Sequence, residues 1–168
     1  MFEHRIIPPM TSVILKRVVA SCVAICGLVF TDADAAPGDV YSGGLSQTAV
    51  YRFTPQGSKS TFVSGPFADS LAFDSFGDLF IADTRAQSIV RVSPAGTVST
   101  FATNIDVTAL AFDRQGNLLV GDMTTDSILK YTPAALRSTL VAGVASPAGL
   151  AVDTAGNVFV SRLEQTRS

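Results

Sequence analysis

An all-β fold built from repeats is predicted by three features of this 168-residue sequence. First, short apolar segments alternate with turn residues after Ala36, and none of these segments has a helical period. Second, four glycines recur at a nearly constant interval: Gly38, Gly77, Gly116 and Gly156. Third, three prolines recur at the same interval: Pro55, Pro94 and Pro133. Similarity at a fixed period of about 40 residues is the mark of a repeat architecture.

Thirteen segments rich in Val, Ile, Phe and Thr are predicted to be strands. They are Asp39–Ser42, Ala49–Thr54, Ser60–Ser64, Ser70–Asp74, Asp78–Asp83, Ser88–Ser93, Val98–Thr103, Ala109–Asp113, Asn117–Asp122, Ser127–Thr132, Arg137–Ala142, Gly149–Asp153 and Asn157–Ser161. Four strands in each repeat unit are typical of a β-propeller, whose blades are four-stranded sheets set around a channel. Within a unit the strands are numbered from the segment that begins at Ser70, Ala109 or Gly149.

Each unit carries an Asp, and a Gly shortly after it, between its first and second strands. The Asp carboxylate can accept hydrogen bonds from its own turn, and the Gly supplies the positive φ that the bend requires. A catalytic group is not normally repeated in every blade, so these residues are predicted to be structural: Asp74, Gly77, Asp113, Gly116, Asp153 and Gly156. Asp83 and Asp122, where second strands end, are predicted to bond the following loops.

A basic residue recurs on the third strand of each unit, at Arg52, Arg91 and Lys130. Apolar neighbours flank it, which favours a solvated strand face. The alternative interpretation is a mild basic ridge that meets a partner.

The units resemble the repeats of NHL-type propellers and of the related gluconolactonase-like family, the senescence-marker-protein group. The matching segments are LAFDSFGDLFIAD, LAFDRQGNLLVGD and GLAVDTAGNVFVS, which begin at Leu71, Leu110 and Gly149. The resemblance extends from Gly38 to Ser161. In this family the first strand of a unit is the innermost strand of its blade. The resemblance therefore implies that the chain starts at the second strand of one blade, contains two complete blades, and reaches the second strand of another. WD-repeat proteins share the period, but this chain has no Trp and no Gly-His signature.

The N-terminal segment is predicted to be a secretory signal peptide. Lys16 and Arg17 precede the apolar run Val18–Phe30, which is shorter than the roughly 20 residues that span a membrane. Cleavage after Ala35 would leave residues 36–168 as the repeat domain, secreted or periplasmic and without a membrane span. Met10 is an alternative start.

Removal of this segment would take both cysteines and His4, the only histidine. A disulfide framework and His- or Cys-based nucleophilic catalysis are then excluded from residues 36–168. The net charge of the full sequence is −2. No strong field is expected to attract nucleic acid.

Six blades of this period would need roughly 240 residues, many more than residues 36–168 provide. A truncated reading frame is therefore our first interpretation. A half-propeller that self-associates and a naturally open fan of blades are the alternatives.

The gluconolactonase-like resemblance implies a divalent-metal site, with Ca²⁺ as the candidate ion, at the channel mouth. There the metal would polarise a lactone carbonyl and activate water. The first-blade Glu of that family has no counterpart, because Glu164 is the only glutamate after residue 35. The remaining candidate ligands are Asp69, Asn104 and Asp106, which otherwise are solvated connection residues.

No catalytic and no cofactor-binding residue is therefore assigned from the sequence. The first hypothesis is an exported binding or scaffold module for a protein or carbohydrate ligand. The second is a metal-dependent hydrolase or a lyase of the streptogramin-lyase kind. The third is a fragment of a longer propeller without independent function.

Overall fold

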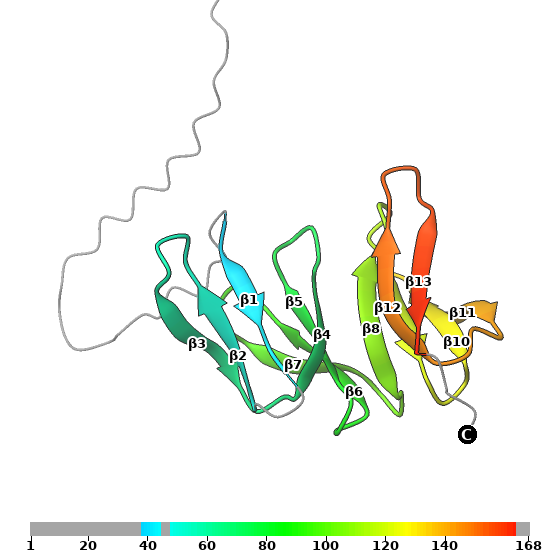
Figure 1. Ribbon diagram of the computed structural model, residues 1–168, viewed down its shortest axis with the longest axis horizontal. Helices are drawn as coiled ribbons and strands as arrows, with labels where there is room; N and C mark the ends of the chain where they lie inside the picture. The colour runs from blue at the N-terminus through cyan, green and yellow to red at the C-terminus, as the bar shows by residue number, and fades with distance from the viewer. Residues whose placement is uncertain (1–37, 45–47, 164–168) are drawn as a thin grey trace, which may run out of the picture. The chain divides into compact units, whose positions relative to one another are not determined.

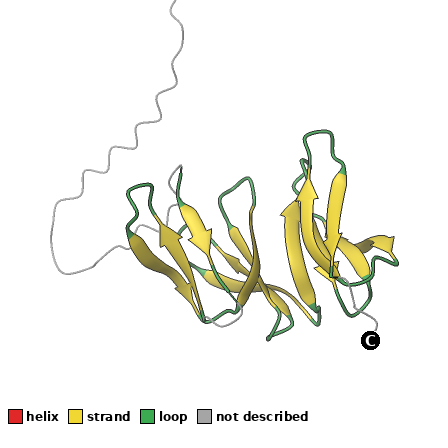
Figure 2. Ribbon diagram, viewed as in Figure 1, coloured by secondary structure: helices red, strands yellow, loops and turns green. Residues whose placement is uncertain are grey.

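The computed structural model describes residues 38–44 and 48–163, and this part of the chain consists of strands and turns without a helix (Figure 2). The predicted signal peptide lies outside these residues. The thirteen strands are β1 (Val40–Ser42), β2 (Ala49–Phe53), β3 (Lys59–Ser64), β4 (Ala68–Phe73), β5 (Leu79–Asp83), β6 (Ser88–Val92), β7 (Val98–Thr103), β8 (Val107–Phe112), β9 (Leu118–Asp122), β10 (Ser127–Tyr131), β11 (Arg137–Ala142), β12 (Pro147–Val152) and β13 (Val158–Arg162). In these residues no helix is long and apolar enough to cross a membrane.

The strands form four antiparallel sheets that follow the chain in order (Figure 1). The sheets are β1-β2-β3, β4-β5-β6-β7, β8-β9-β10-β11 and β12-β13. The strands predicted to be innermost, β4, β8 and β12, contact one another in succession. The predicted partial propeller is confirmed, including its first sheet without an innermost strand and its last sheet with two strands.

The turns between first and second strands have the predicted hydrogen bonds. Oδ1 of Asp74 accepts the backbone N–H groups of Phe76 at 2.8 Å and Asp78 at 2.9 Å, and Gly77 has a φ of 85°. The same pattern recurs at Asp113 and at Asp153. These aspartates therefore cap turns, as the sequence indicated.

Asp83 and Asp122 bond the loops that follow them, also as predicted. Oδ1 of Asp83 accepts the N–H of Ala86 at 3.0 Å. The carboxylate of Asp122 accepts the N–H of Thr124 at 3.1 Å and the hydroxyl of Thr125 at 2.8 Å. Both carboxylates are buried, so these bonds satisfy charged groups that water reaches poorly.

Asp113→Ala is expected to lower the free energy of unfolding by about 1–2 kcal/mol at pH 7, because three hydrogen bonds are lost. The Asp113 carboxylate accepts the N–H of Gln115 and both the backbone and side-chain N–H groups of Asn117. Burial alone would raise the pKa of Asp113, but these bonds and the charge of Lys130 hold it below its ordinary 3.8. The stabilisation is therefore present above pH 3.8 and is lost as the pH falls through the lower folded-state pKa. Urea unfolding at several pH values measures this; an Ala variant that differs equally from the wild type at pH 2 and pH 7 would contradict the assignment.

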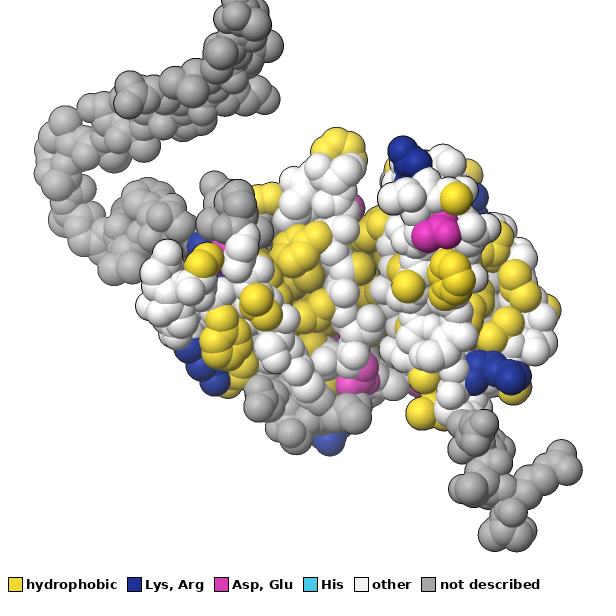
Figure 3. Space-filling view, turned by 45° about the horizontal axis from the view of Figure 1, so that its top comes forward, with side chains coloured by type: hydrophobic (Ala, Val, Ile, Leu, Met, Phe, Trp, Pro, Cys, Tyr) yellow, Lys and Arg dark blue, Asp and Glu magenta, His cyan; other side chains and the backbone are white. Residues whose placement is uncertain are grey.

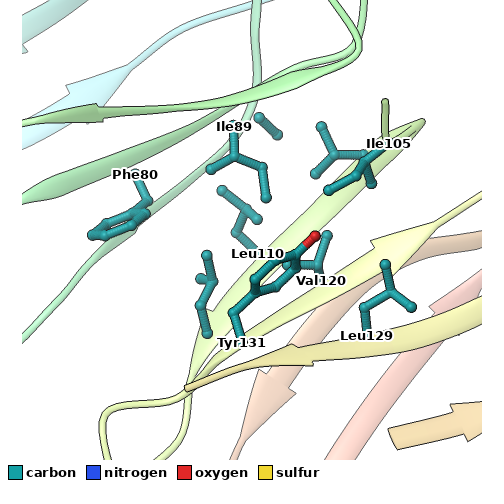
Figure 4. Packing of buried hydrophobic residues seen from close by; sticks show 10 residues of the cluster. Phe80, Ile89, Ile105, Leu110, Val120, Leu129 and Tyr131 are labelled. Carbon is teal, nitrogen blue, oxygen red and sulfur yellow. The ribbon is translucent and has the colours of Figure 1, made fainter. Parts of the chain in front are cut away.

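The hydrophobic core lies between the sheets, because the middle sheets are packed on both faces. Successive side chains of β5 point to opposite faces. Leu79 and Ile81 pack in a cluster with residues of the first sheet, whereas Phe80 and Ala82 pack in a cluster with residues of the third. Figure 4 shows Phe80 among side chains from β6, β8, β9 and β10 and the β7–β8 connection. All five residues of β5 are buried for this reason.

The last sheet has one open face. Phe159 in β13 occupies the repeat position of Phe80, yet it is 59% exposed, whereas Phe80 is 5% exposed. In the part of the chain that the structure describes, β13 pairs only with β12. Figure 3 shows hydrophobic side chains on the surface over the sheets, with charged groups only at scattered points.

The recurring basic residues are ion-paired, which the sequence did not predict, while the side chain of Arg91 remains 48% exposed, in keeping with a solvated strand face. Nε of Arg52 lies 2.6 Å from Oδ2 of Asp39, and Nε of Arg91 lies 2.7 Å from Oδ2 of Asp78. The register explains the pairs: Arg91 stands opposite Phe80, so Asp78, which shares a face with Phe80, is its diagonal neighbour. These arginines are bound to carboxylates of their own blades rather than forming a free basic ridge.

Candidate functional site

A β-bulge recurs near the start of each complete innermost strand. The ladder shifts register between Ala68 and Ser70 in β4, between Val107 and Ala109 in β8, and between Pro147 and Gly149 in β12. A bulge leaves one extra residue outside the ladder and redirects its side chain. The three extra residues are Asp69, Thr108 and Ala148, which occupy the same position in successive units.

These bulge residues line one cavity of about 490 Å³, which we call the mouth cavity. Its walls also include Gly43 after β1 and Thr84 after β5. A Cβ at Gly43 would lie 2.3 Å from the Cβ of Ala68, so glycine permits the first sheet to approach β4 here. The cavity therefore depends on contacts among all four sheets.

Two buried polar atoms in the cavity walls have no hydrogen-bond partner among the described residues. They are Oδ1 of Asp69 and Oγ1 of Thr84. Burial raises the pKa of Asp69 above its ordinary value, and the negative charge of Asp83 raises it further. A hydrogen bond from the Thr84 backbone and the charge of Arg85 act in the opposite direction without cancelling the rise. A buried carboxylate oxygen without a partner calls for an explanation, and a hydrogen bond from a ligand would supply one.

Thr108, in contrast, is engaged within the fold. Its hydroxyl donates to the carbonyl oxygen of Pro147 at 2.5 Å and so ties β8 to β12. Its oxygen can still accept a hydrogen bond, because a hydroxyl is both donor and acceptor. The mouth cavity thus presents one carboxylate and two hydroxyls on described walls that are otherwise formed by small and apolar residues.

Asp69→Asn is expected to raise the melting temperature at pH 7. The pKa of Asp69 is raised by folding, so its ionised form costs stability once the pH exceeds both the unfolded and the folded pKa. Asparagine removes this cost and can keep a hydrogen bond from the Thr84 backbone. The difference from the wild type should vanish as the pH falls below about 3.8, the unfolded value. Calorimetry from pH 3 to pH 8 tests this, and a destabilised variant at pH 7 would overturn the electrostatic interpretation.

Of the three candidate ligands, the structure places only Asp69 in the mouth cavity. Asn104 is exposed after β7 with a φ of 59°, and its Nδ2 lies 3.4 Å from Oγ1 of Thr103. Asp106 precedes β8, where its carbonyl accepts the N–H of Met123 at 3.0 Å. Neither of these two lines the cavity.

Thr84 and Thr108 were not predicted as site residues. A signal for Thr108 existed, since it stands one repeat after Asp69, in the same position of the next unit. A threonine hydroxyl alone does not indicate a binding site, and only the bulge in β8 shows that Thr108 lines the cavity. Thr84 carried no such signal.

The donor set of the mouth cavity does not match a calcium site. Ca²⁺ takes six to eight oxygen ligands, usually with several carboxylates. The described walls supply one carboxylate, Asp69. Among residues 38–44 and 48–163, no group of three or more His, Cys, Asp or Glu residues is placed to hold a metal.

No family model matches this chain, and no curated protein matches it by sequence. Several solved structures are similar to this chain in fold. Virginiamycin B lyase from Staphylococcus aureus superposes with a TM-score of 0.65 at 12% identity, over 77% of this chain and 47% of that chain. A nidogen/laminin complex gives 0.61 at 22% identity, over 71% and 50% of the two chains. A putative gluconolactonase gives 0.56 at 14%, over 68% and 48%.

The chain spans about half the length of these structures. At such identities the similarity concerns the fold alone. It agrees with the resemblance carried by the repeat segments, which pointed to the same group of propellers. Residues 38–44 and 48–163 therefore have the β-propeller fold shared by streptogramin lyases, gluconolactonase-like proteins and NHL-repeat proteins.

Proposed function

We propose that this chain is an exported β-propeller binding module whose ligand occupies the mouth cavity. The observation that carries the proposal is the pair of unpartnered buried atoms, Oδ1 of Asp69 and Oγ1 of Thr84, in the described walls of a 490 Å³ cavity. Ligand sites are typically concave and mostly apolar, with a few polar groups that orient the ligand. The mouth cavity has this composition.

The repeated acidic residues do not compete for this role. Asp74, Asp113 and Asp153 cap turns, and Asp83 and Asp122 bond loops. Asp69 is not repeated, since threonine and alanine stand at its position in the next two blades. An acidic group without a repeated structural role fits a ligand that donates hydrogen bonds, such as a carbohydrate hydroxyl or a peptide N–H.

Neighbouring structures include both binding and catalytic proteins. The nidogen/laminin complex is an assembly of proteins. A virginiamycin B lyase with a histidine-to-alanine substitution is catalytically inactive. In this chain the only histidine is His4, outside the described residues. A binding role does not need a histidine among the described residues, whereas catalysis of that kind would.

The test compares Asp69→Ala with Asp106→Ala. Both remove an acidic residue close to an innermost strand, but only Asp69 lines the cavity. The probes are an oligosaccharide array and a displayed peptide library. A probe retained by the wild type and by Asp106→Ala, and lost by Asp69→Ala, supports the proposal. Equal binding by both variants contradicts it.

The alternative is a Ca²⁺-dependent gluconolactonase-like hydrolase or a lyase. It would require oxygen ligands beyond those that line the mouth cavity. Asp69 is the residue through which it would act. A rise in melting temperature with millimolar Ca²⁺ that EDTA reverses and Asp69→Asn abolishes would favour this alternative over the binding module.

Export rests on the basic residues and apolar run before Ala36. The secreted chain is expected to begin at Ala36. N-terminal sequencing of the protein recovered from the medium or the periplasm measures this. Recovery of an intact N-terminus from the cytosolic fraction alone would contradict it.

A further inference from the structure

A second cavity lies at the opposite ends of the same strands. It has a volume of about 290 Å³, and we call it the inter-blade groove. The turn after β4 and the turn after β8 form its sides, and residues of β5, β6 and β7 also line it. Asp69 precedes Ser70 near the start of β4, whereas Asp74 follows the end of β4, so the groove is separate from the mouth cavity.

The floor of the groove is aromatic. The ring of Phe80 meets the rings of Phe101 and Phe112 edge to face, each with centroids 5.1 Å apart. An equivalent trio, in which Tyr41 meets Phe62 and Phe73, recurs between the first and second sheets. The floor is therefore part of the repeating core.

The rim of the groove is not part of the repeat. Phe76 lies at the tip of its turn and is 81% exposed. Gln115 and Ala155 stand at the same position in the next two turns, and these turns form the same hydrogen bonds. The turn does not need an aromatic residue, so the fold leaves the exposed ring of Phe76 unexplained.

Two arginines line the groove. Arg91, with a side chain 48% exposed, binds Asp78, and Nη1 of Arg114 donates to the carbonyl oxygen of Thr154. A guanidinium has five N–H groups, so each arginine retains donors for a further acceptor. The one carboxylate among the described residues that line the groove, Asp74, uses Oδ1 to accept two backbone N–H groups.

We infer that the inter-blade groove binds an extended peptide segment of a partner protein in which a large apolar side chain stands beside Asp or Glu. The apolar side chain lies against Phe76, Phe101 and Phe112, and the acidic side chain meets Arg114. A cavity of about 290 Å³ has room for one large side chain. Arg114 donates to a neutral carbonyl oxygen, so its charge favours an acidic neighbour over a basic one, whereas the charge of Arg91 is neutralised by Asp78.

The test uses capped tripeptides and the ¹⁵N-labelled chain. Glu-Phe-Glu at millimolar concentration is expected to shift the backbone amide signals of residues 74–76 and 114–116. Glu-Ala-Glu lacks the apolar anchor and Lys-Phe-Lys lacks the acidic groups, so neither should shift them. Raising the salt concentration from about 50 to about 500 mM should weaken binding of Glu-Phe-Glu.

The chain itself supplies matched substitutions. Phe76→Ala and Arg114→Thr introduce the residues that stand at the same positions in the third turn, Ala155 and Thr154, so both variants should fold. Each is expected to raise the dissociation constant of Glu-Phe-Glu at least about fivefold. Phe159→Ala and Lys59→Ala, at an exposed aromatic and an exposed cation elsewhere, should leave it unchanged.

Three results would overturn the inference. They are no amide shifts with Glu-Phe-Glu, equal shifts with Lys-Phe-Lys, and unchanged affinity in Phe76→Ala and Arg114→Thr. Shifts of the same amides by a neutral oligosaccharide such as chitotriose, without shifts by Glu-Phe-Glu, would likewise reject a peptide site in favour of a glycan site.

Discussion

Phe80→Ala is expected to lower the free energy of unfolding by about 3–5 kcal/mol, the usual cost of truncating a buried phenylalanine. Phe80 lies between the second and third sheets and is 5% exposed. Its ring contacts Phe101 and Phe112, so its removal leaves a cavity lined by aromatic edges. Neighbouring sheets can close over such a cavity only in part, because each is held by its own strand ladder.

Phe159→Ala is the matched control for Phe80→Ala. Phe159 occupies the same repeat position in β13, but it is 59% exposed, so the expected change is below about 1 kcal/mol. Urea unfolding followed by tyrosine fluorescence or circular dichroism measures both variants. Equal losses of stability would mean that Phe159 is covered in solution and that the open face of the last sheet is in contact with another surface.

Gly43→Ala is expected to cost about 1–3 kcal/mol, the range found when extra atoms are forced into a packed site. The added Cβ would lie 2.3 Å from the Cβ of Ala68 and 3.1 Å from its carbonyl oxygen. One of these atoms is backbone, so the strain cannot be relieved by a side-chain rotation. The first sheet and β4 must move apart, which also opens the mouth cavity.

Gly44→Ala separates this clash from the general effect of replacing glycine. A Cβ at Gly44 would have no heavy atom within 4 Å, and its φ does not lie in the left-handed region. Its stability should equal or slightly exceed that of the wild type. A thermal shift assay on the pair reports the difference; a Gly43→Ala protein as stable as the Gly44→Ala protein would show that the first sheet does not pack against β4 this closely.

All thirteen strands were predictable from local patterns, except that β4, β8 and β12 each begin two residues earlier than predicted, because the bulge near their start is not visible in the sequence. The alternation of apolar residues and the Asp-to-Gly turns act over short stretches of chain, and such signals survive without tertiary context. The capping roles of Asp74, Asp113 and Asp153 were predictable for the same reason. The fold class needed only the repeat period in addition.

The roles of the basic residues were not predictable in this way. Arg91 pairs with Asp78 because the register of β5 and β6 makes them diagonal neighbours. The repeat relates Arg91 to Arg52 and Lys130, which occupy the same place in other units. Only the hairpin register relates Arg91 to an aspartate at the start of the preceding strand.

The candidate sites were predictable only in part. The residue types that could form a site can be read from the chain: one acidic group at the start of β4, no histidine or cysteine after residue 35, and an aromatic residue at one turn tip. That bulges bring Asp69, Thr108 and Ala148 to one cavity, and that Phe76 and Arg114 flank one groove, became visible with the packed sheets. The physical reason is that both sites are formed by residues a full repeat apart in the chain, whose proximity depends on the packing of one sheet against the next.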